Sequence, residues 1–470
     1  MSRAAEYFHR PAASTRKCED SICLSLNLAT VSRVCLSVAM KNHIRLVALL
    51  LAASLPCSAA NWPAWRGANA DGISTEKNLP LKWSKTENVR WRIPLPEAGN
   101  STPITWGDRI FVTQPVGDRR TLLCLNRADG KQLWQASVAT KEKEPTHGTN
   151  PYCSASPVTD GERVIVSFAS DGLFCYDLSG KELWKRTDLG RQIHIWGNAT
   201  SPVIHGNLCF LNFGPGETTY LLAVDKKTGK TVWKNDEAGG DSGAPPPAPK
   251  DPPADKKAAA PRGKWLGSWT TPLIINEGGR DSILMSWPDR LCALDPATGK
   301  ERWTSKALTA LVYTSPIHAD GIVVAMSGFG GSGLALRTGG SGDVTESKRL
   351  WHHRNSPQRI GSGVIHDGHI YIHNDPGTAM CLNLETGKQV WSERLTGGSA
   401  SGQNWSSVLL ADGKCYTITQ GGDCFVFKAS PTFELLATNP LGEKSNSSIV
   451  PSNGELLIRT HKALWCIGGK

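Results

Sequence analysis

Aromatic, amide and basic side chains gather in short segments that each precede a recurring Ser or Thr. Aromatic rings stack on ligands, and amide and guanidinium groups form hydrogen bonds with them, so the chemistry on offer is binding. We assign no catalytic residue and no metal ligand. The segments contain His147, Asn150, Tyr152, His194, Trp196, Asn198, Trp265, Trp269, Tyr313, Gln358, Arg359, Gln403, Asn404, Trp405 and Asn446.

Six of these residues are ligand-binding candidates: His194, Trp196, Trp269, Arg359, Asn404 and Trp405. The functional interpretation is a ligand or peptide site at the mouth of a central funnel on which the segments converge. The structural alternative is that Trp and Asn only close the turns between repeated units. The structural alternative is favoured for any single residue, whereas a binding face is favoured for the cluster as a whole.

The recurring Ser or Thr marks the start of a repeated unit, and we call these residues the anchors. A Gly and an apolar run follow each anchor by five or six residues, and Pro follows the first five anchors directly. Successive anchors are 41 to 54 residues apart except for one interval of 70, which contains a Pro/Ala/Lys-rich insert at 236–264. This composition predicts a mobile surface loop. The anchors are Thr102, Ser156, Ser201, Thr271, Ser315, Ser362, Ser407 and Ser448.

A second motif, Asp/Asn-x-x-Thr-Gly-Lys-x-x-Trp, lies within most units. It is complete at Asp225–Trp233, Asp295–Trp303 and Asn383–Trp391, and degraded at Asn126–Trp134 and Asp177–Trp184. Asp or Asn accepts hydrogen bonds from backbone amides two residues on, and Gly accepts the positive φ of a bulged turn. Apolar alternation on both sides predicts a β-hairpin.

Eight units with room for four short strands each predict an all-β fold, an eight-bladed β-propeller of four-stranded blades. The last unit, from Ser448, offers only three strands and lacks the repeat Trp. An unassigned segment, Asn88–Leu95, carries Trp91 at the corresponding position. We therefore expect the N-terminal strand to complete the last blade, which removes open sheet edges.

The repeat Ala-x-Asp-x-x-Thr-Gly-Lys-x-x-Trp, complete at Ala223–Trp233 and Ala293–Trp303, resembles that of pyrroloquinoline-quinone-type propellers. Trp62-Pro63-x-Trp65-Arg66-Gly67 and the segment Leu336–Thr345 are similar to segments of a large group of secreted propellers in this superfamily. The resemblance covers essentially all of residues 61–470. It implies the fold strongly and the function weakly, because propellers carry many activities.

Two known branches of this superfamily imply two function classes. The propeller lipoprotein of the outer-membrane β-barrel assembly machine implies a non-enzymatic module that binds protein or glycan in the envelope. The quinoprotein alcohol and sugar dehydrogenases imply an oxidoreductase with pyrroloquinoline quinone and calcium. The second branch carries an adjacent Cys-Cys pair and an Asp base, and this chain has no such dipeptide and no convincing Asp match. We favour the binding module, without a cofactor, and keep the quinoprotein as the alternative.

The first sixty residues are expected to lie outside the propeller. Met40–Ala60 has a basic start, an apolar core of about ten residues and a small-residue end, the pattern of a signal peptide. Residues 1–39 suggest a mis-assigned start, and Leu55-Pro56-Cys57 is a poor lipidation site. We expect an exported monomer, periplasmic or extracellular, with one propeller at 61–470 and no transmembrane segment in the mature chain.

The charge of the chain argues against nucleic-acid binding, and the positions of its cysteines indicate a structural role. The net charge is +10, of which residues 1–60 supply +4, and no Lys/Arg cluster interleaves with aromatic residues, so nucleic acid is not an expected partner. Nine cysteines remain after position 60. Cys124, Cys175, Cys381, Cys424 and Cys466 are assigned to the position of Ala223, as buried small apolar residues. Asp343 is expected to cap a turn rather than bind calcium.

Overall fold

The computed structural model describes residues 61–141, 143–216, 218–237, 266–399 and 402–468. The expected signal peptide at Met40–Ala60, with Cys57 and the residues before it, lies outside the described residues. Trp265 and residues 238–264 of the insert also lie outside them. Asp236 and Glu237, which were assigned to the insert, instead complete the strand Thr231–Glu237, where Glu237 pairs with Arg290.

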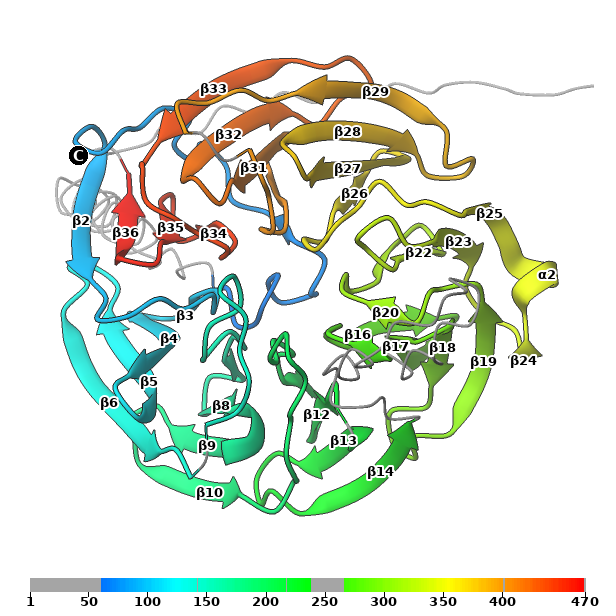
Figure 1. Cartoon of the computed structure of the whole chain (residues 1–470), viewed down its shortest axis with the longest axis horizontal. Helices are drawn as coiled ribbons and strands as arrows, with labels where there is room; N and C mark the ends of the chain where they lie inside the picture. Colours follow the sequence, from blue (N-terminus) through cyan, green and yellow to red (C-terminus); the bar gives the residue numbers. More distant parts are fainter. Residues whose placement is uncertain (1–60, 142, 217, 238–265, 400–401, 469–470) are drawn as a thin grey trace, which may run out of the picture. The chain divides into compact units, whose positions relative to one another are not determined.

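Eight antiparallel four-stranded sheets follow one another around a central axis, with the first strand of each blade innermost (Figure 1). The expected all-β class and eight-bladed propeller are confirmed. Blades one to four are β3 (Ile104–Trp106), β4 (Arg109–Val116), β5 (Arg119–Asn126), β6 (Gln132–Ala139); β7 (Val158–Thr159), β8 (Arg163–Ser167), β9 (Leu173–Asp177), β10 (Glu182–Arg186); β11 (Val203–His205), β12 (Leu208–Phe213), β13 (Thr219–Asp225), β14 (Thr231–Glu237); β16 (Leu273–Glu277), β17 (Arg280–Trp287), β18 (Arg290–Leu294), β19 (Glu301–Lys306).

The remaining blades repeat this order. Blades five to eight are β21 (Ile317–Ala319), β22 (Ile322–Met326), β23 (Gly333–Arg337), β25 (Arg349–His353); β26 (Val364–His366), β27 (His369–Asn374), β28 (Thr378–Asn383), β29 (Gln389–Arg394); β30 (Leu409–Ala411), β31 (Lys414–Ile418), β32 (Asp423–Lys428), β33 (Leu435–Pro440); β34 (Val450–Pro451), β35 (Leu456–Arg459), β36 (Ala463–Ile467), β2 (Val89–Pro94). Short additional elements are β1 (Ile73–Ser74), β15 (Gly267–Ser268), β20 (Leu311–Val312), β24 (Gly342–Asp343), the 3₁₀ turn η1 (Ala169–Asp171) and α2 (Thr345–Lys348).

The last blade is closed by a strand from the other end of the described chain. β2 pairs antiparallel with β36, with Trp91 opposite Cys466 and Ile93 opposite Leu464. The blue strand and the red strand lie side by side in Figure 1. This confirms the closure predicted from the missing fourth strand, and it leaves blade eight paired on both sides of β36.

Each repeat turn is built as its sequence predicts. In blade three, Asp225 Oδ1 accepts the N–H groups of Lys227 at 3.1 Å and Thr228 at 2.8 Å. Gly229 adopts φ +71°, which favours glycine. The strand pairing shifts register beside the turn. The turn therefore combines a side-chain cap, a glycine and a bulge.

The tryptophan that ends each repeat packs against the turn of the following blade. Trp233 Nε1 donates to the carbonyl of Pro296 at 2.9 Å, and a Cβ on Gly299 would lie only 2.6 Å from the Trp233 ring. Trp303 instead donates to Glu277 at 3.1 Å. We call these residues the tryptophan belt. Its other members, each bonded to a carbonyl of the following blade, are Trp91, Trp134, Trp184, Trp351 and Trp391.

Blade seven departs from the sequence assignment. Cys424 was placed at the position of Ala223, but Cys424 pairs with Asn439, and Val426 stands at the bulge opposite Ala437. The assignment was wrong by two residues because this unit lacks the repeat turn that fixes the count. Since strand side chains alternate with a period of two, Cys424 still lies on the same face as Val426 and is buried.

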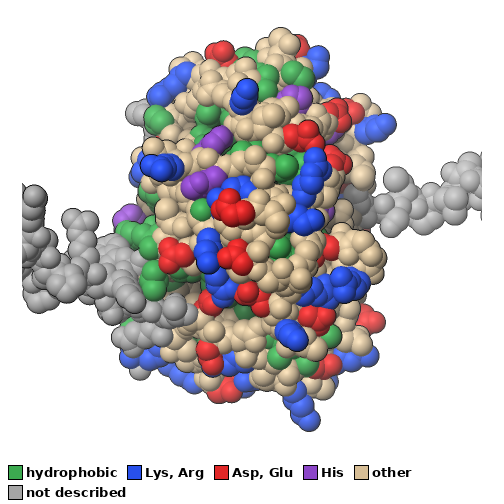
Figure 2. Space-filling model, turned by 90° about the vertical axis from the view of Figure 1, so that its right-hand side faces the viewer, with side chains coloured by type: hydrophobic (Ala, Val, Ile, Leu, Met, Phe, Trp, Pro, Cys, Tyr) green, Lys and Arg blue, Asp and Glu red, His purple; other side chains and the backbone are tan. Residues whose placement is uncertain are grey.

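Charged side chains of both signs mix on the side of the propeller that Figure 2 turns to the viewer. The nine cysteines of the described residues are buried and free of disulfides. Burial raises the pKa of the Cys153 thiol to about 12, so it stays protonated at neutral pH. No helix among the described residues is long and apolar enough to cross a membrane.

Candidate functional site

The eight anchors form a ring of hydrogen bonds around the axis. The backbone N–H of one anchor donates to the side-chain hydroxyl of the next at 2.8 to 3.2 Å in seven of the eight steps, and Ser448 to Thr102 closes the circle. In the remaining step the Ser362 hydroxyl donates to the carbonyl of Ser315 at 3.3 Å. The anchors therefore join neighbouring inner strands as well as starting each unit.

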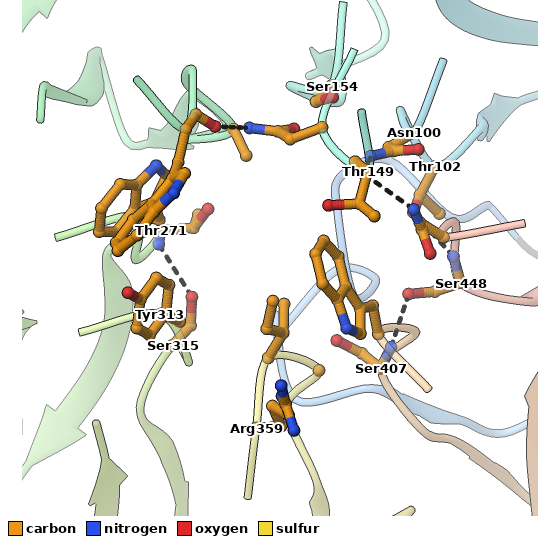
Figure 3. A pocket seen from close by; sticks show the side chains of 18 of the residues that line it. Asn100, Thr102, Thr149, Ser154, Thr271, Tyr313, Ser315, Arg359, Ser407 and Ser448 are labelled. Carbon is orange, nitrogen blue, oxygen red and sulfur yellow. Dashed lines mark hydrogen bonds between the residues drawn. The ribbon is translucent and has the colours of Figure 1, made fainter. Parts of the chain in front are cut away.

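A cavity of about 640 Å³ opens inside this ring. Seven anchors line it, and so does the residue two positions before every anchor: Asn100, Ser154, Ala199, Trp269, Tyr313, Ile360, Trp405 and Asn446. An extended chain turns alternate side chains to the same side, which explains why both positions face the axis. Figure 3 shows Tyr313 and Asn100 on opposite sides of the opening.

The N-terminal segment 61–74 crosses the central axis, as the blue trace at the centre of Figure 1 shows. It is bonded to blade one through Trp62 and Thr105, to blade two through the Pro63 carbonyl, and to blade seven through β1 and β30. Trp65 contributes to the cavity lining. The channel is thus closed at one end by the chain itself.

Arg66 holds this segment in place. Its side chain is 3% exposed and donates to the carbonyls of Ser362 at 3.1 Å and Gly363 at 2.7 Å in blade six, as well as to Asp71 within the segment. Loss of hydration on burial lowers the pKa of the Arg66 guanidinium to about 10, and it remains charged at neutral pH. Backbone carbonyls therefore satisfy a buried cation.

Four of the six ligand-binding candidates line the cavity: Trp196, Trp269, Arg359 and Trp405. His194 and Asn404 are each 1% exposed and lie behind the wall. His194 packs edge-on against Trp269 at 4.8 Å between ring centroids. Asn404 donates to the His373 carbonyl and the Thr417 hydroxyl and accepts from the Ser406 N–H.

The aromatic side chains of the wall form a continuous arc. Trp269 stacks on Tyr313 with centroids 4.8 Å apart, and Tyr313 meets Phe329 at the same distance. Trp196 extends one end, 5.9 Å from Trp269, and Trp405 extends the other, 6.3 Å from Phe329. We call these five residues the aromatic arc.

The opposite part of the wall is polar. Asn100 and Asn446 both donate to the carbonyl of Thr149, at 2.9 and 2.8 Å. Asn150 donates to the carbonyl of Trp196 at 2.7 Å. Figure 3 draws the bond between Thr149 and the neighbouring amide as a dashed line. The amides are held by backbone bonds and are therefore preorganised.

Arg359 is the charged side chain of the cavity lining. Its Nη1 lies 2.9 Å from Asp375 Oδ2, and its guanidinium lies 4.3 Å from the centroid of Phe329. The Asp375 side chain is only 2% exposed, and burial raises the pKa of this carboxyl while Arg359 opposes the shift. The positive charge of Arg359 at the cavity is thus paired with the buried carboxyl group of Asp375.

Sequence reasoning missed several lining residues. Asn100 and Ser154 precede their anchors by two positions, as Trp269 and Trp405 do, so a period-two rule would have found them. The same rule places Asn404, three positions before Ser407, on the other side, although Arg359, three positions before Ser362, still lines the cavity. Phe329 follows an inner hairpin and precedes no anchor, so no repeat signal marks it.

The residues of the cavity do not fit a calcium-bound quinone. Calcium takes six to eight oxygen ligands, carboxylates prominent among them, and the described lining contains no Asp or Glu. No cluster of His, Cys, Asp or Glu suited to a metal occurs among the described residues. Asp343 accepts the Thr345 N–H at 3.0 Å and pairs with Lys306, so its carboxylate caps the turn that precedes α2.

The model of one protein family matches residues 73–248 and 217–462, most of the propeller. The chain belongs to the family of the outer membrane protein assembly factor BamB. This confirms the resemblance drawn from the repeat.

Similar proteins come from both branches. A polyvinylalcohol dehydrogenase from a Pseudomonas species is 24% identical over 277 residues, which are 52% of this chain and only 40% of that protein. BamB from Moraxella catarrhalis has a TM-score of 0.55 at 13% identity and covers 80% of this chain and 98% of its own. A europium-containing methanol dehydrogenase has a TM-score of 0.62 at 12% identity, over 86% and 90%. At these identities the solved structures show the fold alone.

Proposed function

We propose that the protein is an exported binding module, periplasmic or extracellular, whose axial cavity holds a ligand. The carrying observation is the lining: the aromatic arc and Arg359 stand opposite preorganised amides in a closed-ended cavity of about 640 Å³. Binding sites for small ligands typically span about 300–1,000 Å³ and combine apolar walls with a few placed polar groups. The relation to BamB supports a role without chemistry, with envelope protein or glycan as the partner class.

Tryptophan fluorescence offers a direct test, because the four tryptophans of the lining would report on an occupant. The protein from residue 61 is titrated with peptide and glycan fractions of cell envelope. We expect a saturable change in fluorescence. The substitutions Trp405→Ala and Arg359→Ala should each reduce the free energy of binding by more than about 1 kcal/mol, the usual scale for binding anchors. Leu133→Ala, on the outer strand β6, serves as the control. Titrations that neither cavity variant alters would refute the proposal.

A quinoprotein oxidoreductase remains the second candidate, favoured by the relatedness to polyvinylalcohol dehydrogenase. A planar quinone could stack on Trp269, but the lining provides no carboxylate for its calcium. Incubation with pyrroloquinoline quinone and calcium decides between the two. Stoichiometric quinone binding with dye-linked oxidation of an alcohol or sugar would overturn the binding-module proposal.

A further inference from the structure

Three side-chain atoms of residues that line the cavity have no hydrogen-bond partner among the described residues: Trp405 Nε1, Asn446 Oδ1 and Arg359 Nε. Trp405 Nε1, at the end of the aromatic arc, is a buried donor without an acceptor. Asn446 Oδ1, on the polar side, is a buried acceptor without a donor, while its Nδ2 is fixed on Thr149. Buried polar atoms without partners are unfavourable, and here an unpaired donor and an unpaired acceptor belong to residues that line the same cavity. A hydroxyl group both donates and accepts, so a ligand rich in hydroxyls would satisfy both.

The charge of the wall disfavours ionic ligands. The described lining holds Arg359 and no carboxylate, and Asp375 already lies 2.9 Å from Arg359. A phosphate or a polyanion would find no cluster of cations, and a cationic ligand would find no carboxylate. The wall is therefore matched to a neutral ligand.

The aromatic arc supplies the other half of the recognition. Its rings present apolar faces opposite the amides of Asn100 and Asn446, and a sugar ring has just this division, with apolar C–H faces and a rim of hydroxyls. Phe329 is 44% exposed and continues the arc toward solvent. A chain of several sugar units could follow the arc outward.

The N-terminal segment 61–74, which includes Trp65, limits how a chain of sugar units could enter the cavity. It closes the axis at one end, and Arg66 fixes it to blade six through two carbonyls. A polymer therefore cannot pass through the propeller. A chain end fits a cavity with one mouth, whereas the interior of a chain does not.

We infer that the cavity binds the terminal units of a neutral oligosaccharide, with sugar rings stacked on the aromatic arc and hydroxyls bonded to Trp405 Nε1 and Asn446 Oδ1. This inference rests on the proposed function, because it names the ligand of the same cavity. It excludes acidic glycans and peptides as the main ligands.

The experiment is an array of neutral oligosaccharides, acidic oligosaccharides and peptides, probed with the protein from residue 61. We expect neutral oligosaccharides with a shared terminal unit to bind, with affinity that stops rising once the chain exceeds the cavity. Trp405→Ala and Asn446→Ala should each weaken binding at least fivefold, and Leu133→Ala should not. Trp405→Phe, which keeps a ring but removes the N–H, should fall between the wild type and Trp405→Ala.

Three outcomes would overturn the inference, and they differ in what they leave standing. Capture of peptides alone, dependent on Trp405, would refute the sugar ligand and leave the binding module intact. Equal binding of linear oligosaccharides and cyclic ones of the same units would refute recognition of a chain end. An array with no signal that depends on Trp405 or Asn446 would refute both this inference and the proposed function. Unchanged unfolding midpoints establish that the variants are folded.

Discussion

The tryptophan belt and the aromatic arc place the same residue type in different surroundings. In the belt, each indole N–H is bonded within the fold, as Trp233 is to Pro296, and a turn glycine packs on the ring. In the arc, Trp269 also donates its N–H within the fold, to the Gly197 carbonyl at 2.8 Å, but Trp405 keeps an N–H without a partner, and both residues line the cavity. Belt residues recur at one position of the repeat, while the tryptophans of the arc come from the segments between repeats. Stability and binding are therefore carried by separate tryptophans.

Deletion of residues 61–95 should have the largest effect on the belt side of this comparison. It removes β2, which carries Trp91 and completes blade eight, and leaves β36 with an open edge. We expect aggregation or a large loss of stability, measured by solubility and by thermal unfolding. Deletion of 61–74 alone keeps β2 and should remain folded. A protein without residues 61–95 that melts like the full mature chain would show that closure by β2 is unimportant.

A matched pair of substitutions tests the comparison directly. Trp303 is 1% exposed, so Trp303→Ala should lower the free energy of unfolding by about 3–5 kcal/mol through lost contacts and a cavity. Trp405→Ala should lower it by less than about 1 kcal/mol, because the ring borders a space that is already open. Urea unfolding midpoints measure both. Equal losses of stability would mean that the arc is structural, and the distinction between the two sets would fail.

The repeat-derived half of the molecule could be predicted from the sequence, and the ligand-facing half only in part. The turns at Asp225 and Asp295 and the anchor spacing identify the eight blades, because turn chemistry and strand alternation are local. The closing strand followed from counting the strands after Ser448.

The cavity wall depends on contacts that have no repeat signal. Phe329 reaches it from a hairpin, and Trp65 reaches it because the N-terminal segment crosses the axis. Residue type alone selected Asn404, which faces inward toward Thr417 rather than the cavity. Side-chain direction carries the missing information, and position relative to the anchor gives it only in part, since Arg359 lines the cavity at the same offset from its anchor as Asn404.

His194 links the two sides of the comparison, since it lies behind the arc and is buried like a belt residue. Its Nδ1 accepts the N–H of Trp196 at 3.3 Å, and its ring packs against Trp196 and Trp269. Burial lowers the pKa of His194 to about 4. Protonation would remove the lone pair that accepts from Trp196. The neutral imidazole therefore supports the wall that carries the arc.

Acid should destabilise the fold through this residue. In the unfolded state the histidine has a pKa of about 6.5. In the folded state the pKa of His194 is about 4, so between these two pH values the unfolded state binds a proton that the folded state does not. The contribution of His194 to the free energy of unfolding is therefore present above pH 6.5 and is lost as the pH decreases toward 4. Between pH 7 and pH 5 the loss is about 2 kcal/mol. Burial lowers the pKa of His373 and His461 in the same direction.

The variant His194→Gln isolates this contribution, because its amide keeps a polar group near Trp196 and does not titrate. Urea midpoints measured at pH 7 and pH 5 should differ less in the variant than in the wild type, even if the variant is less stable at pH 7. An identical pH dependence in the two proteins would mean that His194 is not held neutral in the fold. In that case the arc would not depend on its uncharged imidazole, and the wall behind Trp196 would tolerate a charge.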